Sequence, residues 1–328
     1  MKRKEFIKKS VITPGIAATF PFAMITKSES PFDSKPKTRR NGQVPGIYRT
    51  KVGHATITAI LDGFIDIDPE FWVNLTSEQL KKELALNFMD PNIPVRISVN
   101  TYIIDTGERA VALDTGAANF FGPSAGRYAQ NLKFAGYAPD SIDVVLLTHM
   151  HSDHIGGLIA GGKAVFPNAE IIGNAIEHNY WANSMNKSNA PEFAKPWFDA
   201  VQTVTKKYDG RITLYKGEKE VIPGFQSISH YGHTPGHSGY IFLSNGEKLF
   251  FWADITDQTA LQLNHPERTL IFDVDKEEGQ KARQKGIELA VWEKMQIARS
   301  HVPFPSFGYI DKTKTGYHSQ PSPWKHEI

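Results

Sequence analysis

Four side chains that commonly bind metal ions fall within six consecutive residues of this chain. They are His149, His151, Asp153 and His154, and they follow the apolar run 143–148. Side chains alternate along an extended chain, so His149 and His151 can point the same way, while Asp153 and His154 can reach a second position beyond the turn. That arrangement suits two cations about 3.5–4 Å apart. A polar surface turn would explain one histidine, but not four residues of metal-binding type directly after a predicted buried strand.

The absence of cysteine from the 328 residues narrows the chemistry of such a site. Any metal must be held by histidine and carboxylate, a donor set that fits zinc, manganese, iron or cobalt. Ser152 lies inside the cluster, but it has no separate base to activate it. The pattern therefore predicts hydrolysis by a metal-activated hydroxide, without a covalent enzyme intermediate.

Composition and charge set the class of protein and exclude one class of partner. Hydrophobic residues make up 40% of the chain and charged residues 22%, which is the mix of a soluble globular protein. The formal charge is +2, but residues 1–30 contain six basic and two acidic side chains, a balance of +4. The remaining residues therefore carry −2, and a nucleic-acid partner is not expected.

The N-terminus has the pattern of an export signal. A basic start is followed by the apolar stretch 11–25, which is too short, and too broken by prolines, for a stable membrane span. The stretch Arg3-Lys-Glu-Phe-Ile-Lys8 resembles a twin-arginine signal with lysine in the second position. We expect residues 1–30 to direct export to the periplasm, 31–45 to be a linker and 46–328 to be the folded domain. An ordinary secretory signal and a basic disordered tail are the alternatives.

The elements that must position the metal ligands alternate between strands and helices. Strands are predicted at 55–61, 99–104, 110–113, 143–148, 239–243 and 249–252. Residues 175–206 have a mainly helical pattern, and a long amphipathic helix is predicted over 276–298. Two β-rich halves, each followed by helices, predict an α/β fold in which two mixed sheets pack face to face with helices outside.

The histidine cluster also carries a family resemblance. His149-Met-His-Ser-Asp-His154 resembles the H-x-H-x-D-H hallmark of the metallo-β-lactamase superfamily. Further motifs appear in the family's order, and they are the turn at Asp114, Gly232-His233-Thr-Pro-Gly-His237, Phe250-Phe-Trp-Ala-Asp254 and Ser300-His301. The resemblance covers about residues 46–312 and implies the four-layer αββα sandwich of that family.

The resemblance also implies a role for each motif residue. One metal would be held by His149, His151 and His233, and the other by Asp153, His154 and His301. Asp254 would bridge both metals, Asp254 and Asp153 would be the catalytic carboxylates, and Asp114 and His237 would support the ligands from behind. The implied cofactor is a pair of divalent ions, zinc in the first place, with manganese, iron or cobalt as alternatives.

Several longer stretches resemble the methyl parathion hydrolase-like and lactonase-like group of the superfamily. They are 114–123, 131–137, 148–158 and 164–169. The bridging aspartate is typical of this group and is missing from true β-lactamases. In the group an aromatic pocket holds the leaving group, and the matching residues here are Phe121, Trp181, Trp197 and Phe198. Composition alone would place these aromatic residues in the core.

Three departures from the group pattern bear on the substrate. Ala253 and Ser306 replace glycines, and Asp257 stands where an apolar pocket residue is expected. We expect a small, neutral ester-like substrate, a lactone or an aryl ester, and incidental activity on phosphotriesters. A dedicated organophosphate hydrolase is the main alternative, and a mononuclear iron oxygenase and a non-catalytic metal-binding protein are further alternatives.

Relatives in the group are commonly dimers, so the resemblance also implies that this protein is a homodimer.

Overall fold

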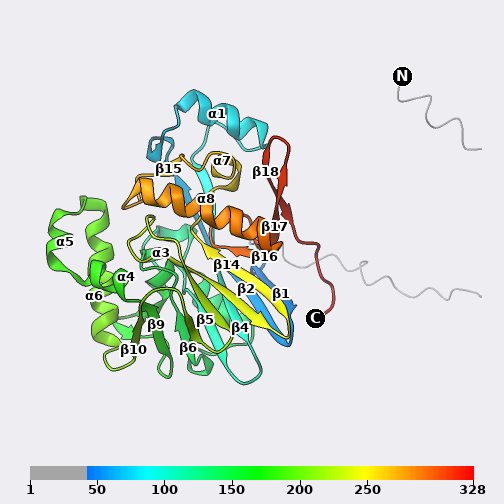
Figure 1. Cartoon of the computed structure of the whole chain (residues 1–328). Helices are drawn as coiled ribbons and strands as arrows, with labels where there is room; N and C mark the ends of the chain where they lie inside the picture. Colours follow the sequence, from blue (N-terminus) through cyan, green and yellow to red (C-terminus); the bar gives the residue numbers. More distant parts are fainter. Residues whose placement is uncertain (1–42) are drawn as a thin grey trace, which may run out of the picture. The chain divides into compact units, whose positions relative to one another are not determined.

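Two seven-stranded sheets lie at the centre of the fold (Figure 1). The first has the strand order β1 (Ile47–Val52), β2 (Ala55–Ile67), β4 (Val95–Asp105), β5 (Ala110–Leu113), β6 (Val144–Leu146), β9 (Glu170–Asn174) and β10 (Ile212–Tyr215). The second has the order β11 (Glu220–Ile222), β12 (Phe225–Ser229), β13 (Ser238–Ser244), β14 (Glu247–Ala253), β16 (Gln296–Arg299), β17 (Gly308–Thr313) and β18 (Gly316–Pro321). Both sheets contain parallel and antiparallel neighbours.

Eight α-helices and two small two-stranded sheets complete the part of the chain that the structure describes. The helices are α1 (Ser77–Leu86), α2 (Tyr128–Phe134), α3 (Ser152–Ile155), α4 (Ala175–Ala182), α5 (Ser184–Asn189), α6 (Lys195–Lys207), α7 (Thr259–Gln262) and α8 (Lys276–Glu293). The small sheets pair β3 (Trp72–Val73) with β15 (Thr269–Leu270) and β7 (Ile159–Ala160) with β8 (Lys163–Ala164).

The structure is a computed structural model that describes residues 43–328, of which Val44–Ile328 form one compact unit. The predicted export signal at 1–30 lies outside the described residues, as does most of the predicted linker at 31–45. In the described part, no helix has both the length and the apolar character needed to cross a membrane.

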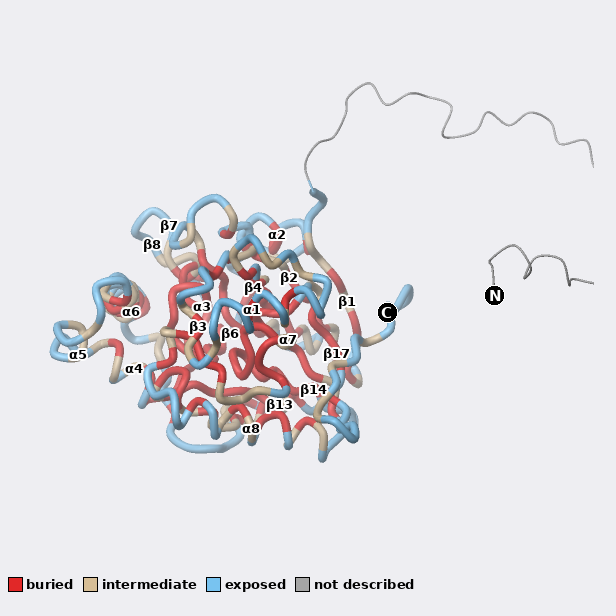
Figure 2. The backbone as a smooth tube through the Cα atoms, turned by 90° about the horizontal axis from the view of Figure 1, so that it is seen from above, coloured by how far each residue is buried: buried red, intermediate tan, exposed pale blue. Residues whose placement is uncertain are grey.

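The core consists of separate layers that follow the arrangement of the sheets. One cluster joins inward-facing side chains of both sheets, including Tyr102 from β4 and Phe251 from β14. A second packs the outer face of the first sheet against α2 and α6, and another packs the outer face of the second sheet against α8. Seen from above, the buried strands lie between α2 and α8 (Figure 2). The predicted αββα fold class is confirmed.

Two predicted helical segments differ from the structure in their limits. The helix predicted over 276–298 ends at Glu293, because Lys294 adopts a left-handed conformation and residues 296–299 form β16. The consecutive residues Ile297 and Ala298 are apolar because both lie in a buried strand in the interior of the second sheet. The segment 175–206 contains three helices, and Pro196 lies in the first turn of α6, where proline is well tolerated.

Strand directions explain why motifs far apart in sequence meet at one place. β5 and β6 run parallel, with Leu113 opposite Leu146, so the residues after both strands leave the first sheet at the same edge. β14 and β16 are also parallel, with Ala253 opposite Arg299. Asp254 and His301 therefore emerge next to each other from the second sheet.

Candidate metal centre

The loop after β5 holds the histidine loop in place through Asp114. Asp114 Oδ1 accepts from Thr148 N at 2.9 Å, and Oδ2 accepts from Thr148 Oγ1 at 2.8 Å and from His154 Nδ1 at 2.9 Å. The residue has a left-handed backbone with φ 58°, a conformation that aspartate adopts more readily than most residues. The structure thus places Asp114 behind the histidine cluster, as predicted from the turn.

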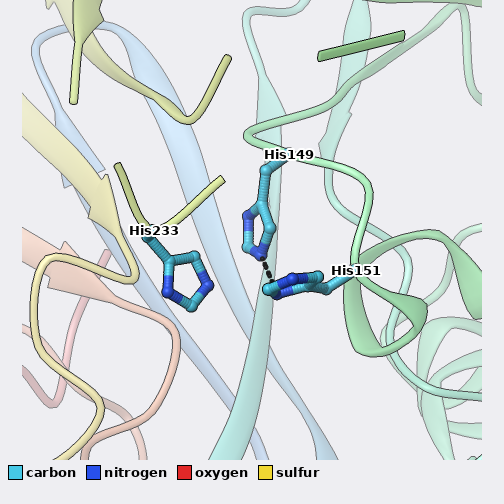
Figure 3. Close-up of side chains that lie close together, drawn as sticks. All are labelled: His149, His151 and His233. Carbon is cyan, nitrogen blue, oxygen red and sulfur yellow. Dashed lines mark hydrogen bonds between the residues drawn. The ribbon is translucent and has the colours of Figure 1, made fainter. Parts of the chain in front are cut away.

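The seven residues predicted to bind metals come together from both sheets and are all buried. His149, His151 and His233 form one group in which a ligand atom from each lies within 4.8 Å of the others (Figure 3). Asp153, His154 and His301 form a second group of the same kind, and Asp254 lies beside both. The first-sheet loop thus supplies four of these residues, and loops of the second sheet supply three.

Distances around Asp254 test whether the cluster fits metal ions. Four imidazole nitrogens surround Asp254 Oδ2, at 2.9 Å (His301 Nε2), 3.2 Å (His154 Nε2), 3.3 Å (His233 Nε2) and 3.5 Å (His149 Nε2). Two ligands on one tetrahedral zinc ion are about 3.3–3.5 Å apart when each bond is 2.0–2.1 Å long. The spacing therefore matches ligands that share metal ions, and the residues fit two such ions.

Unpaired atoms at the same place support this fit. In the part of the chain that the structure describes, His154 Nε2, His233 Nε2 and Asp254 Oδ1 are buried without a hydrogen-bond partner. Buried polar atoms in proteins nearly always have a partner, so atoms like these call for an ion or another missing ligand. His151 Nδ1 lies 3.1 Å from His149 Nε2, which is again a distance between two ligands of one ion.

Hydrogen bonds to the other ring nitrogen fix the orientation of four ligand histidines. His149 Nδ1 lies 3.0 Å from Thr148 Oγ1, and His154 Nδ1 lies 2.9 Å from Asp114 Oδ2. In the second-sheet half, His233 Nδ1 lies 2.7 Å from Asp273 Oδ1, and His301 Nδ1 lies 2.8 Å from Ser98 O. Each ring donates through Nδ1, so Nε2 is the nitrogen that would bind a metal ion at the centre of the cluster. Such partners orient ligand histidines and make them more basic.

Asp273 is a functional residue that the sequence analysis missed. It is 2% exposed, accepts from His233 Nδ1 and lies 3.4 Å from Arg283 Nη2 of α8. The two charged partners hold the pKa of Asp273 below its usual value despite its burial. No motif marks this residue, because its distance from His233 along the chain depends on the intervening strands. An isolated Asp before a predicted helix was the only available signal.

Glu177 is a second missed residue, and it links the two histidine loops. Its Oε1 accepts from Met150 N at 2.9 Å and from Trp181 Nε1 at 2.7 Å, and its Oε2 accepts from Gly236 N at 2.8 Å. Gly236 is needed here, because a Cβ at that position would lie 2.4 Å from Glu177 N. One buried carboxylate on α4 therefore sets the separation of the loop at 149–154 from the loop that carries His233.

His237 supports the centre from behind and uses both ring nitrogens within the protein. Its Nδ1 donates to His230 O at 3.0 Å, and its Nε2 accepts from the backbone N–H of Asp254 at 3.2 Å. Burial lowers the pKa of His237 to about 3, which keeps the ring neutral. The structure therefore places His237 behind the bridging carboxylate rather than among the ligands, as predicted.

The charges in the cluster are strongly coupled. Burial lowers the pKa of His149 well below its usual value, and the neighbouring His154 lowers it further. Burial acts in the same direction on His154 and His301, but Asp254 and Asp153 outweigh it, so the pKa of His154 is raised well above normal and that of His301 to about 9. Protons on these rings compete with metal ions, which makes metal binding depend on pH.

An aromatic cavity of about 280 Å³ lies next to the cluster. Trp181, Trp197 and Phe198 are among its lining residues, and the rings of Trp181 and Trp197 lie 5.4 Å and 4.8 Å from that of His151. Phe198 is fully buried and also packs in the core between α6 and the first sheet. Three of the four predicted pocket aromatics thus line one cavity.

The other predicted pocket residues lie elsewhere. Phe121 packs against the apolar cluster beneath α1 and does not line this cavity. Asp257 lies with Asp254 and His301 in the metal cluster. The cavity instead includes Phe193 and Phe272, which the sequence analysis missed, and the ring of Phe272 lies 6.0 Å from that of Trp197.

Comparison with known proteins agrees with the geometry. The N-acyl homoserine lactonase of Bacillus thuringiensis is 27% identical over 168 residues, which cover 45% of this chain and 60% of the lactonase. The chain thus spans less than two thirds of the length of the curated lactonases that it matches. The solved structure described as hydrolase AbOPH in the beta lactamase superfamily is 30% identical, with a TM-score of 0.80 over 87% of this chain and 100% of that one.

A second solved structure is similar over the same extent. AidC, described as a dizinc quorum-quenching lactonase, is 27% identical, with a TM-score of 0.81 over 86% of this chain and 99% of that one. The family profile described as Metallo-beta-lactamase superfamily matches residues 95–273, which hold six of the seven proposed ligands. By this match and by its fold, the chain belongs to the metallo-beta-lactamase superfamily.

Proposed function

We propose that this chain is a metal-dependent hydrolase that holds two divalent cations, zinc in the first place, and cleaves lactones or other neutral esters. The observation that carries the proposal is the convergence of four imidazole nitrogens on Asp254 Oδ2 at ligand-to-ligand distances. The dizinc lactonase among the structural neighbours supports the same metal and the same substrate class.

Two bound cations would supply a Lewis acid for the ester carbonyl and lower the pKa of bound water. The chain's own residues perform the remaining tasks. Asp254 lies between the two groups of histidines and would fix their separation, and its Oδ1 has no hydrogen-bond partner in residues 43–328. Asp153, whose Oδ2 lies 3.4 Å from His301 Nε2, completes the second group.

The cavity beside His151 supports a neutral, partly apolar substrate. Six aromatic residues, including Trp197, Phe193 and Phe272, form part of its lining and favour an acyl or aryl group over a charged phosphate. Phosphotriesters are also neutral, so the similarity to lactonases, rather than the cavity, ranks lactone and aryl-ester hydrolysis above the hydrolysis of phosphotriesters.

The first test of this proposal is metal content and turnover of purified protein. We expect about two metal ions per chain by elemental analysis, and loss of ester hydrolysis in His151→Ala and Asp254→Ala. The control is His265→Ala, since His265 is a partly exposed histidine outside the cluster that pairs with Glu267. Undiminished turnover in either ligand variant would rule out the metal mechanism.

The substrate class is tested by comparing kcat/KM for a lactone, an aryl ester and an aryl phosphotriester. We expect the first two to be preferred. A preference for the phosphotriester by about 100-fold, which equals about 2.7 kcal/mol of transition-state discrimination, would make the chain a dedicated organophosphate hydrolase instead.

Export and dimer formation are also proposals. The basic and apolar pattern of residues 1–30 supports export to the periplasm through a twin-arginine-like signal. Fractionation of cells that express the full chain, with and without the basic residues at its start, tests export. Light scattering of the purified protein tests whether it is a dimer.

A further inference from the structure

Asp257 is a third buried carboxylate at the metal cluster, besides Asp153 and Asp254. It is 3% exposed and lies three residues after Asp254, just before α7. One oxygen of its carboxylate, one of Asp254 and one nitrogen of His301 all lie within 4.8 Å of one another. Asp257 therefore faces the second group of ligands, on the side of His301.

Gln262 at the end of α7 fixes the position of Asp257. Its Oε1 accepts from Asp257 N at 2.7 Å and from Gln258 N at 3.1 Å, and its Nε2 donates to Asp257 Oδ2 at 3.2 Å and to Arg268 O at 3.2 Å. Gln262 is fully buried, so its amide is locked by these four bonds. A neutral amide thus orients the carboxylate and adds no positive charge beside it.

No lysine or arginine forms an ion pair with Asp257 in the described range 43–328. Arg268, whose carbonyl oxygen accepts from Gln262, donates to Leu261 O and pairs with Glu83 instead. A buried carboxylate without a positive partner costs several kcal/mol, so a cation in its immediate neighbourhood would explain its presence.

We propose that Asp257 is an eighth metal ligand, which makes the site formed by Asp153, His154 and His301 rich in oxygen and favourable for a hard dication such as Mn²⁺. With Asp254 shared, this site has three carboxylates and two imidazoles. The other site has three imidazoles and the shared carboxylate, a set that suits zinc. Imidazole favours zinc, whereas carboxylate oxygens suit manganese and similar ions. The inference rests on the two-cation site of the proposed function.

The test is titration of Mn²⁺ into metal-free protein preloaded with one equivalent of zinc, followed by the electron paramagnetic resonance signal of free Mn²⁺. We expect the unaltered chain to bind one Mn²⁺ and Asp257→Asn to bind it at least ~10-fold more weakly, since even residues behind a ligand change metal affinity by 10–100-fold. Asparagine can still accept the hydrogen bond from Gln262, so only the charge is lost.

Three further variants keep the experiment decisive. Asp257→Glu and Asp257→Gln have the same size and differ in charge, and we expect Mn²⁺ binding only with glutamate. Asp273→Asn removes the carboxylate behind His233, so it should weaken zinc at the first site and spare Mn²⁺ at the second. A thermal melt of each metal-free variant verifies that the fold is intact.

The outcomes separate this inference from the proposed function. If the unaltered chain binds no cation, the two-metal hydrolase itself is wrong. If the unaltered chain, Asp257→Asn and Asp257→Gln all bind Mn²⁺ with equal affinity, the two-metal hydrolase stands and Asp257 is not a ligand.

Discussion

Single residues behind the ligands decide how the histidines present their lone pairs. Asp114, Asp273 and the hydroxyl of Thr148 each accept a hydrogen bond from the Nδ1 of a predicted ligand histidine. His237 differs from these residues, because its Nε2 accepts a hydrogen bond from the backbone N–H of Asp254. This bond fixes the position of Asp254 between the two groups of predicted ligands. At this scale, the site depends on which nitrogen of each ring carries the proton.

The pH dependence of stability tests the neutral state of His237. Its pKa is about 3 in the folded protein and about 6.5 in an unfolded chain. Below pH 6.5 the unfolded chain binds a proton that the folded chain does not, so stability falls with pH, by up to about 1.4 kcal/mol per unit. His237→Gln cannot titrate but can still accept from Asp254 N.

We therefore expect the stability advantage of the unaltered chain over His237→Gln to shrink between pH 6.5 and 4.5. The measurement is urea unfolding of both metal-free proteins at each pH, so that titration of the ligand histidines cancels in the difference. An advantage that stays constant over this range would show that His237 is already protonated in the fold or that its burial does not matter.

Among the elements, α8 contributes most to the second-sheet half of the site. Arg283 in the middle of α8 is 1% exposed and donates to Ile255 O, Pro266 O and Asp273 Oδ2. The helix approaches closely because Gly232 has φ 129° and a Cβ there would lie 2.0 Å from Gly279 N. Helix α8 thus holds both Ile255, the residue after Asp254, and Asp273, the hydrogen-bond partner of His233.

Replacement of Arg283 by methionine tests this role of α8. The change leaves Asp273 with His233 as its remaining partner and removes the donor to two carbonyl oxygens, so we expect about 3–5 kcal/mol less free energy of unfolding and weaker zinc binding. Lys281→Met is the matched control on the same helix, since Lys281 is exposed and pairs only with Glu278, and it should change neither quantity. Equal stability of the two variants would contradict the role of Arg283.

At the scale of the whole molecule, the metal centre joins the edges of the two sheets. His149 to His154 follow the first sheet, whereas His233, Asp254 and His301 belong to loops of the second. Without cations, this cluster brings several buried imidazoles and carboxylates together. Bound metals would therefore stabilise the contact between the two halves of the fold as well as serve the reaction.

Removal of metal should accordingly lower the thermal stability of the protein. A cation at 1,000 times its Kd adds about 4.1 kcal/mol per site, and 1 kcal/mol corresponds to roughly 2–4 °C in Tm for a domain of 150–250 residues. We expect a chelator to lower Tm by at least about 8 °C and added zinc to restore it. An unchanged Tm would mean that the cluster holds no stabilising metal.

The local sequence was sufficient to predict the fold class, the family and the positions of the seven clustered residues. The four residues between His149 and His154 are so close in sequence that their spacing is visible without a structure. The motifs around His233, Asp254 and His301 are also short enough to be identified from the sequence alone. Strand periodicity likewise predicted β5 at 110–113 with its observed limits. The predicted end of α8 was wrong, because an apolar residue such as Ile297 fits a buried strand as well as the buried face of a helix.

Only the tertiary structure decided which distant residues complete the site. Asp273, Glu177 and Gln262 act through single hydrogen bonds across the fold, and no short motif encodes a partner whose distance along the chain is set by intervening strands. The position of Asp257 changed for the same reason, from a predicted pocket wall to the metal cluster. The sequence alone predicted the seven clustered residues because their motifs are local, whereas the residues that support them were found only in the structure because packing is not local.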